Sequence, residues 1–290
     1  MKIATYRVGG ERRVGAVDVE RQTIAPFDVS MEEASRGLLA LIARNPLPPL
    51  LQPMPLREAI LEAPVPLPVR NIFCVGKNYH AHAKEFASSG FDSSAAQGDV
   101  PPHPIIFSKV PECVVAHRVP VRLAPSVSTA IDYEAELAVI IGKGGRGISK
   151  ADALDHVWGY TILNDVTARD IQGRHSQWLL GKSQDTFGPM GPWAVTRDEI
   201  DLASTGVRCW INGELRQDAN TADLIFDVPT LIETISQGIT LVPGDIIATG
   251  TPAGVGIGYK PPKYLRDGDV MKIEISGIGV LENQVRETAA

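Results

Sequence analysis

The segment 131–142, IDYEAELAVIIG, constrains the fold more than any other stretch of the chain. Its apolar run, LAVII, is typical of a strand buried inside a sheet. Because side chains alternate between the two faces of a strand, Asp132, Glu134 and Glu136 are predicted to share one face. Acids that share a buried face repel one another unless a cation or hydrogen-bond donors compensate them. We therefore expect a bound divalent metal here, and the alternative is a solvated acidic edge strand.

A second β-rich run, 158–166, carries Asp165 near its end. If this strand lies beside the first, Asp165 could supply one more oxygen ligand. A set of oxygen ligands without Cys or His favours a hard ion, with Mg²⁺ first and then Mn²⁺ or Ca²⁺. Three protein ligands on an octahedral ion leave about three positions for water and substrate oxygens. Such an open arrangement is typical of a catalytic metal.

The composition excludes several classes of protein. The chain is 44% hydrophobic and 21% charged, which is ordinary for a soluble globular protein. Its 290 residues permit one large domain or a small domain attached to a large one. A net charge of −6 without a Lys/Arg cluster argues against a nucleic-acid partner. No apolar run is long enough to cross a membrane. Cys74, Cys113 and Cys209 form no CxxC pair, so we expect no disulfide framework, no zinc site and a cytoplasmic protein.

The first part of the chain is predicted to form a separate small unit. Two β-rich runs around Gly9-Gly10 indicate a hairpin, and 31–44 has the pattern of an amphipathic helix. Eight prolines between Pro46 and Pro68 indicate an extended linker. We therefore divide the chain into a small domain with its linker, 1–66, and a catalytic domain, 67–290.

His82 and Glu85 lie in a segment of helical composition and are three residues apart, so they share a helix face. A histidine oriented by a carboxylate is the usual general base. The alternative is an ordinary pair on a solvated helix face. The following segment, 86–103, is rich in Ser, Ala, Gly and Pro and is predicted to form a lid over the metal.

Further polar residues could contact an anionic substrate. Lys109 ends the strand PIIFSK and could face a substrate anion or simply be solvated. Arg169 and Gln172 are three residues apart and suit a carboxylate and a carbonyl oxygen. Lys182 is predicted to neutralise an enolate or oxyanion beside the metal. Thr251 lies in a Gly-rich stretch that could bind a carboxylate or could be plain turn structure.

A glycine pattern after the acidic segment, Gly142, Gly144 and Gly147, matches GxGxxG. We reject a dinucleotide site because the predicted helix that follows, 149–156, is short and the preceding strand carries three acids. Downstream, Asn212-Gly213 predicts a hairpin and 229–238 predicts a short helix.

Taken together, these segments resemble the fumarylacetoacetate hydrolase family. The blocks VGKNYHAHAKE, PIIFSK, DYEAELAVIIG, GYTILNDVTARDIQ, GKSQDTFGPMGPW, INGELRQ and PGDIIATGTPAGVG occur in the order of the family over about residues 70–286. The resemblance implies a β-rich α+β fold, with a mixed β-sandwich roll and a small N-terminal α+β domain. It also implies a homodimer or a larger homo-oligomer. The chain departs from the family at Ala116-His117, where many members have Gly-Pro, and we expect this change to alter the pocket rim.

The resemblance also implies roles for residues. Asp132 is expected to lie outside the metal-ligand set, because the chain matches the branch of the family with three carboxylates. The implied metal ligands for Mg²⁺ or Mn²⁺ are Glu134, Glu136 and Asp165. The implied water-activating pair is His82 and Glu85, with Lys182 as the cation beside the metal. The implied substrate contacts are Arg169, Gln172 and Thr251.

The expected function is a Mg²⁺- or Mn²⁺-dependent hydrolase that cleaves a C–C bond in a small β-diketo acid. The substrate would be an acylpyruvate such as fumarylpyruvate, from aromatic or sugar-acid catabolism. The alternatives on the same metal site are an oxaloacetate decarboxylase and a hydroxydienedioate isomerase. Two other classes are less well supported. They are an NAD(P)-binding oxidoreductase, which rests only on the glycine pattern, and a non-catalytic metal-dependent binding module.

Overall fold

The acidic segment forms the centre of the fold. Residues Ala135–Ile141 make strand β11, which pairs with β12 (Val157–Asn164) on one side and with β17 (Ile246–Ala248) on the other. Every residue of β11 is buried. The buried strand is therefore confirmed, and the alternative of a solvated edge strand is wrong. One detail differs, because the segment is not a single strand: a short strand β10 (Ile131–Asp132) precedes β11.

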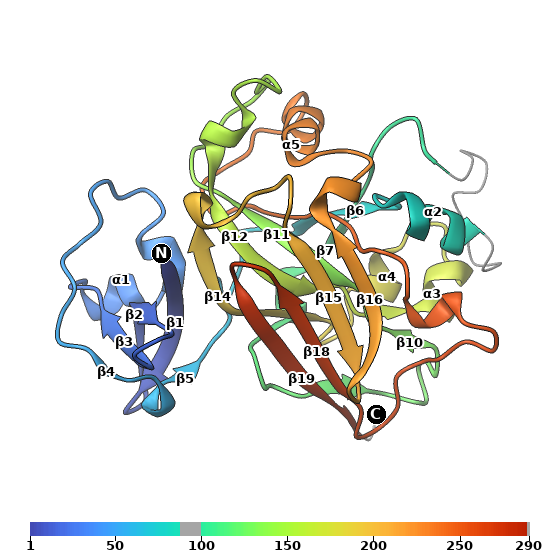
Figure 1. Ribbon diagram of the computed structural model, residues 1–290, viewed down its shortest axis with the longest axis horizontal. Coiled ribbons are helices and arrows are strands. Elements are labelled where there is room, and N and C mark those ends of the chain that lie inside the picture. Colours follow the sequence, from blue (N-terminus) through green and yellow to red (C-terminus); the bar gives the residue numbers. More distant parts are fainter. Residues whose placement is uncertain (88–99, 289–290) are drawn as a thin grey trace.

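The computed structural model describes residues 1–87 and 100–288, and β11 lies in its 12-stranded sheet (Figure 1). Most of the predicted lid lies outside these described residues. The strand order is β4-β3-β2-β1-β14-β12-β11-β17-β6-β7, with β5 beside β1 and β8 beside β14. The bounds of the other strands are β1 (Lys2–Val8), β2 (Glu11–Asp18), β3 (Thr23–Pro26), β4 (Met54–Pro55), β5 (Ile60–Leu61), β6 (Ile72–Gly76), β7 (Ile105–Lys109), β8 (Val114–Val115) and β14 (Gly188–Thr196).

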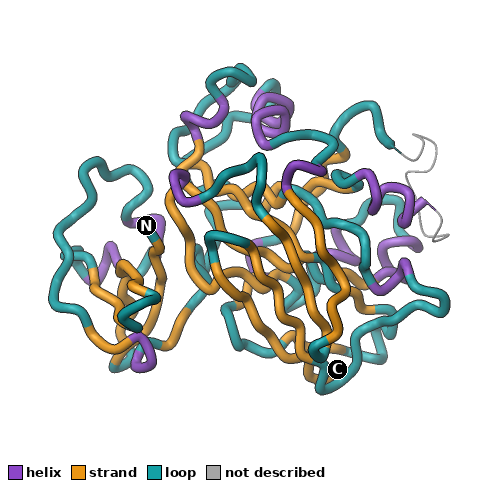
Figure 2. Tube along the Cα trace, in the orientation of Figure 1, coloured by secondary structure: helices purple, strands orange, loops and turns teal. Residues whose placement is uncertain are grey.

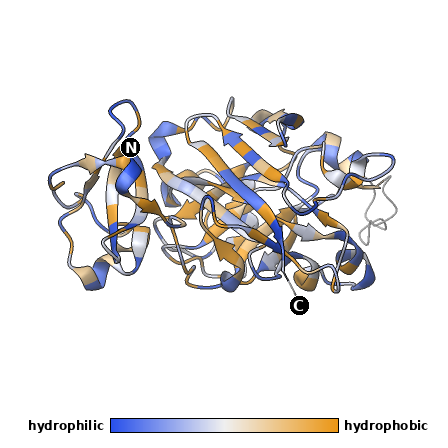
Figure 3. Ribbon diagram, turned by 90° about the horizontal axis from the view of Figure 1, so that it is seen from below, coloured by the Kyte–Doolittle hydropathy of each residue, from blue (hydrophilic) through white to orange (hydrophobic). Residues whose placement is uncertain are grey.

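A five-stranded sheet covers one face of the large sheet (Figure 1). Along two of its strands, buried and partly exposed residues alternate, as expected for a sheet with one face in the core. Figure 3 shows the same alternation as bands of hydrophobic and hydrophilic colour. Its strands, in spatial order, are β16 (Glu214–Asn220), β15 (Gly206–Ile211), β18 (Val270–Ile275), β19 (Gly279–Glu287) and β9 (Val121–Leu123). The predicted hairpin at Asn212-Gly213 joins β15 to β16, and both turn residues have positive φ.

Strand β11 lies between two cores. Leu137 and Val139 pack in the core that includes the five-stranded sheet, whereas Ala138 and Ile140 pack in a second core on the other face. A strand buried on both faces needs apolar side chains on both. This explains the uninterrupted run LAVII, and it places the acids at the end of the strand where the run begins.

The N-terminal part of the chain extends the large sheet, because β1 pairs with β14 through Lys2↔Val195 and Ile3↔Ala194. The helix predicted over 31–44 is wrong as a continuous element. It is broken into α1 (Met31–Ala34) and the 3₁₀ turn η1 (Gly37–Ala40), because Gly37 has φ +60°. The predicted linker also contains short elements, namely β4, β5 and η2 (Leu56–Glu58). The division at residue 66 stays a prediction.

Few helices accompany the sheets, and Figure 2 shows them around the rim of the strands. Helix α5 (Val228–Ser236) confirms the helix predicted near 229–238, and the Asp227 side chain caps it by accepting the Thr230 N–H at 2.9 Å. The predicted helix 149–156 is only a 3₁₀ turn, η5 (Ala153–His156). The remaining helical elements are α2 (His80–Ala87), α3 (Arg169–Arg174), α4 (Leu179–Lys182), η4 (Pro111–Cys113), η6 (Arg197–Glu199), η7 (Thr221–Asp223) and η8 (Gly256–Gly258).

Gly159 allows β12 to lie close against β14 in the large sheet. A Cβ atom at this position would lie 1.9 Å from the Val195 carbonyl oxygen on β14. We expect Gly159→Ala to lower the free energy of unfolding by more than about 2 kcal/mol, because the strands must move apart. Urea denaturation measures this change. Gly238→Ala is the matched control, since no atom of the described residues lies within 4 Å of its added Cβ. Equal stability of the two variants would contradict the argument.

His117 belongs to the departure from the family pattern, and it contacts β19 rather than the pocket. Its Nδ1 accepts the Glu282 N–H at 3.0 Å. Burial, followed by the charge of Arg118, lowers the pKa of His117 from 6.5 to about 4. The unfolded chain therefore binds more protons between these values, so this contribution to stability is full above about pH 6.5 and is lost as the pH falls towards 4.

We expect His117→Asn, which keeps an acceptor for the Glu282 N–H, to lose less stability than the wild type between pH 7 and pH 5. Urea midpoints measured across this range check the prediction. Parallel pH curves for the two proteins would show that His117 does not titrate in this way.

Candidate active site

The antiparallel register of β11 and β12 brings the predicted metal ligands together. Ala135 pairs with Asn164, so the residues that flank this pair, Glu134 and Asp165, lie side by side, and the Asp165 N–H donates to the Glu134 carbonyl at 2.9 Å. One oxygen of each side chain of Glu134, Glu136 and Asp165 lies within 4.8 Å of the others. All three residues are buried. The arrangement is a compact cluster of carboxylates.

Asp132 lies outside this cluster, and this position agrees with the expectation from the family resemblance. Its Oδ2 accepts from Arg169 Nε at 2.8 Å and from the Ile257 N–H at 3.0 Å, and its Oδ1 accepts the Gly256 N–H at 2.6 Å. Both oxygens are thus used to hold the loop at η8 against Arg169. Alternation along a strand would have placed Asp132 beside Glu134, but the break between β10 and β11 turns it away.

Two lysines lie against the carboxylates. The ammonium of Lys182 lies 2.8 Å from Glu134 Oε2 and 2.8 Å from Asp165 Oδ2. Lys109 is fully buried, and its ammonium lies 2.7 Å from Asp165 Oδ1 and also donates to the carbonyl of Lys182. The expectation that Lys109 is solvated is therefore wrong. Its ammonium binds Asp165, and Lys109 is not one of the residues that line the pocket.

The charges of the cluster explain its pKa shifts. Burial alone would raise the pKa of Glu134, but Lys182 and Arg169 overcome this effect and lower the pKa to about 2. Glu136 has no cation partner among the described residues, and one of its oxygens accepts the Gly250 N–H at 2.8 Å. Burial, and then repulsion from Asp165 and Glu134, raise the pKa of Glu136 well above its ordinary value.

This imbalance fits a divalent cation. Among the described residues, three buried cations (Lys109, Arg169 and Lys182) form ion pairs with three buried carboxylates (Asp132, Glu134 and Asp165), and none of these ion pairs includes Glu136. The carboxylate that lacks a cation, Glu136, is one of the three whose oxygens converge. Oxygen donors at this spacing suit a hard divalent ion. The residues present therefore fit a metal held by Glu134, Glu136 and Asp165.

The predicted histidine–carboxylate pair forms on α2. His82 Nδ1 lies 3.1 Å from Glu85 Oε2, and Glu85 also accepts the Gly254 N–H at 3.0 Å. His82 is buried, so the alternative of a solvated helix face is wrong. Because Nδ1 is engaged by Glu85, the other ring nitrogen is the one left for chemistry in the pocket that His82 lines.

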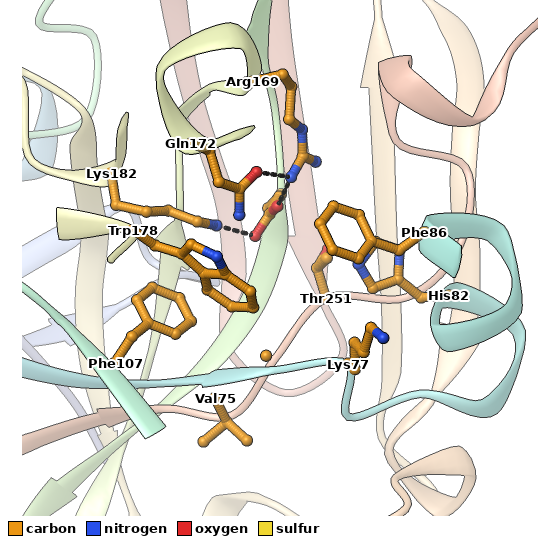
Figure 4. A pocket seen from close by; sticks show the side chains of 12 residues that line it. Val75, Lys77, His82, Phe86, Phe107, Arg169, Gln172, Trp178, Lys182 and Thr251 are labelled. Atoms are coloured by element: carbon orange, nitrogen blue, oxygen red, sulfur yellow. Dashed lines mark hydrogen bonds and ion pairs between the residues drawn. The ribbon is translucent and has the colours of Figure 1, made fainter. Parts of the chain in front are cut away.

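His82 and Glu134, one of the three clustered carboxylates, line one pocket with about 290 Å³ of empty space. Figure 4 shows Arg169, Gln172 and Lys182 on one side of it and His82 on the other. Arg169 Nη1 lies 2.8 Å from Glu134 Oε1 and donates to Gln172 Oε1 at 3.1 Å. Thr251 lines the same pocket. The structure therefore brings together all the predicted site residues, with Lys109 behind the cluster.

Arg169 also has an unused donor. Its Nη2 is buried and has no hydrogen-bond partner within residues 1–87 and 100–288. A buried donor without a partner costs about 1–3 kcal/mol, so a ligand oxygen that accepts from it gains affinity. A carboxylate is the acceptor that a guanidinium binds best. This donor is well suited to a substrate acid group.

Six pocket residues were not found from the sequence: Val75, Gly76, Lys77, Phe86, Phe107 and Trp178. The ring of Trp178 packs edge-on against both Phe86 and Phe107. It also covers Gly76, where a Cβ would lie 2.6 Å from the Trp178 ring. Trp178 and Phe86 are apolar residues that follow polar runs, which is the signal that could have indicated them, whereas Phe107 lies in an apolar strand and carries no such signal. Lys77 has φ +54°, and no sequence pattern predicts that.

Comparisons with known proteins agree with this geometry. The model of the fumarylacetoacetate (FAA) hydrolase C-terminal family matches residues 71–286. The oxaloacetate tautomerase YisK of Bacillus subtilis (strain 168) is 52% identical over 231 residues, which are 79% of this chain and 74% of that protein.

Solved structures cover nearly the whole chain. A fumarylacetoacetate hydrolase from psychrophilic Exiguobacterium antarcticum has a TM-score of 0.82 at 41% identity and covers 99% of this chain and 100% of its own. A maleylpyruvate hydrolase from Sphingobium sp. SYK-6, in complex with manganese(II) and pyruvate, has a TM-score of 0.76 at 32% identity, with 99% of each chain covered. Among the described residues, no helix has the length and apolar character needed to span a bilayer.

Proposed function

Since the chain belongs to the fumarylacetoacetate hydrolase family, we propose that it is a metal-dependent tautomerase that interconverts the enol and keto forms of oxaloacetate or a related 2-oxo dicarboxylic acid. The observation that carries the proposal is the pocket itself, which is lined by Glu134 of the carboxylate cluster, by His82, which is paired with Glu85, and by Arg169 with its unused donor. The 52% identity to an oxaloacetate tautomerase supports the choice of substrate. This proposal favours the isomerase alternative over the C–C hydrolase that the sequence led us to expect.

In the proposed reaction, three pocket residues have separate roles. When an enol becomes a ketone, its O–H bond breaks and releases a proton to solvent water, and a C3–H bond forms with a proton from an acid. His82, oriented by Glu85, would donate the proton to C3 in this direction and remove it in the reverse direction. Lys182 is placed to hold negative charge that develops on the C2 oxygen. Arg169 Nη2 would bind the C1 carboxylate.

Glu134, Glu136 and Asp165 would hold the metal, for which we propose Mg²⁺ or Mn²⁺. When bound, the ion would supply Lewis-acid polarisation of the 2-oxo group. Lys109 would keep Asp165 charged and oriented from the side that faces away from the pocket. The carboxylates would thus be neutralised both by side-chain cations, among them Lys109, and by one exchangeable metal ion.

The proposal is tested by following the decay of freshly dissolved enol-oxaloacetate by its ultraviolet absorbance. We expect the purified protein with Mn²⁺ to accelerate the decay and the same protein with EDTA to lose this acceleration. Mass spectrometry of the products should show oxaloacetate unchanged in mass. Release of carbon dioxide and pyruvate would instead indicate a decarboxylase, and no acceleration with metal would reject the tautomerase.

A hydrolase that cleaves a C–C bond is the second candidate. The observation that favours it is that a histidine paired with a carboxylate at 3.1 Å could equally remove a proton from an attacking water. The similarity to a maleylpyruvate hydrolase agrees with this. Incubation with acylpyruvates and fumarylpyruvate distinguishes the two, because only a hydrolase forms pyruvate and a second acid. Static light scattering of the same preparation checks the homo-oligomer that the resemblance implied.

A further inference from the structure

A second groove, outside the candidate active site, carries an excess of positive charge. It lies between the residues around β16, at the edge of the five-stranded sheet, and the segment 259–266, and it has about 840 Å³ of empty space. No residue that lines it also lines the active-site pocket. Its cationic and aromatic lining residues are Arg216, Tyr259, Lys260, Lys263, Tyr264 and Arg266.

The acids near the groove do not cancel this charge. Glu214 pairs with two of the cations, since its carboxylate lies 2.9 Å from Arg216 Nη2 and 2.9 Å from Lys263 Nζ. Asp269 instead accepts the backbone N–H of Arg266 at 2.7 Å and the Asn212 amide at 2.7 Å. The side chains of Lys260 and Arg266 take part in no hydrogen bond or ion pair within the described part of the chain.

Arg216 is held rigidly and is incompletely satisfied. Its side chain is only 10% exposed, and its Nε is buried without a hydrogen-bond partner among the described residues. Its guanidinium stacks on Tyr259, 5.0 Å from the ring centre, and the ammonium of Lys263 lies 4.4 Å from the same centre. One ring therefore holds two cations close together. Glu214 already bridges these two cations, and the Nε of Arg216 is the donor that is left for a bound anion.

The groove is connected to the His82–Glu85 pair by direct contacts. Arg216 Nη1 lies 3.4 Å from the Tyr133 hydroxyl, which donates to the Gly254 carbonyl at 2.8 Å. Gly254 in turn donates its N–H to Glu85 at 3.0 Å. The backbone of Arg216 also lies directly against Gly254: a Cβ atom added to this glycine would lie 1.8 Å from the Arg216 carbonyl oxygen. Arg216 is therefore in contact, directly and through Tyr133, with the residue that donates to Glu85.

We propose that this groove binds a small multivalent oxyanion, such as inorganic phosphate or a dicarboxylate, and that the bound anion changes the setting of the His82–Glu85 pair. Lys260 and Arg266 supply positive charge that is unpaired among the described residues. Arg216 links the bound anion to Glu85 through Tyr133 and Gly254. The binding site stands independently of the proposed function. Only the consequence for turnover rests on it.

Isothermal titration calorimetry of phosphate into the metal-free protein tests the binding. We expect saturable binding that weakens at least tenfold in the double variant Lys260→Ala/Arg266→Ala. The control is Lys143→Ala/Arg146→Ala, which removes the same charge from two exposed cations outside the groove and should bind as the wild type does. Anion bound in the active site would persist in the first double variant, so the comparison isolates the groove. Absence of saturable binding, or equal binding by both double variants, would overturn the site.

A second arm repeats the titration with malonate and shows whether the groove prefers a dicarboxylate to phosphate. Coupling is read from the imidazole NMR signals of His82, with the exposed His80 on the same helix as the internal reference. We expect phosphate to move the His82 signals in the wild type and not in the Lys260→Ala/Arg266→Ala variant. Binding without this movement would overturn the coupling. Binding by a protein that is inactive on oxaloacetate would reject the proposed function and leave the groove in place.

Discussion

Glu136→Gln is expected to abolish tight Mn²⁺ binding and, at the same time, to make the metal-free protein more stable. The loss follows because Glu136 is one of three converging ligands, and we expect affinity to fall by at least about 10²-fold. The gain follows because burial and two neighbouring carboxylates raise the pKa of Glu136, so its ionised form opposes folding at neutral pH. Glutamine keeps an acceptor for the Gly250 N–H.

Two measurements check the expected loss of Mn²⁺ affinity and the expected gain in stability of the metal-free protein. Calorimetric titration with Mn²⁺ gives the affinity, and urea denaturation in EDTA gives the stability of the metal-free protein. Glu58→Gln removes an exposed carboxylate elsewhere and should change neither quantity. Unchanged Mn²⁺ affinity in Glu136→Gln would remove Glu136 from the ligand set, and a destabilised metal-free variant would contradict the charge argument.

His82→Ala is expected to lower the turnover number by about 10²- to 10⁴-fold while Mn²⁺ affinity stays unchanged. The reason is that His82 is not among the converging carboxylates, but it lines the pocket with one ring nitrogen held by Glu85. Steady-state kinetics on enol-oxaloacetate, run beside Mn²⁺ titration, separate the two properties.

The neighbouring His80 provides the control for this experiment. It lies on the same helix and is exposed, so His80→Ala removes a histidine from α2 without touching the pocket. Glu85→Gln should lower the turnover number less than His82→Ala does, because the imidazole of His82 stays in place and loses only its charged partner. Full turnover by His82→Ala would assign the proton transfer to another group.

The carboxylate cluster could be predicted from the sequence because its geometry is local. Glu134 and Glu136 are two residues apart beside a strand, and Asp165 follows the strand that pairs with it. Asp132 shows the limit of this reasoning. Its spacing placed it with the other acids, and only the family resemblance placed it outside. The break between β10 and β11 depends on contacts with Arg169 and the loop at η8, which are distant in sequence.

Elements whose conformation depends on distant packing were predicted less well. Residues 31–44 have a helical pattern, and Leu38 and Leu41 are buried as the pattern implies. The chain nevertheless breaks at Gly37, where a Cβ would lie 2.7 Å from the Thr5 hydroxyl. Lys109 ends a strand, and nothing in its neighbourhood shows that its ammonium reaches Asp165. Both features depend on residues that are far away along the chain.

The pairing of β1 with β14 has a consequence for biosynthesis. Strands β1 and β2 form a hairpin that can close as soon as both have left the ribosome, whereas Val195, the partner of Lys2 on β14, is made about 190 residues later. At about 5–20 residues per second, the Lys2–Ile3 edge stays open for roughly 10–40 s. An unpaired strand edge is a template for wrong association. The yield of folded protein in a cell should therefore depend on translation speed and on chaperones that cover this edge.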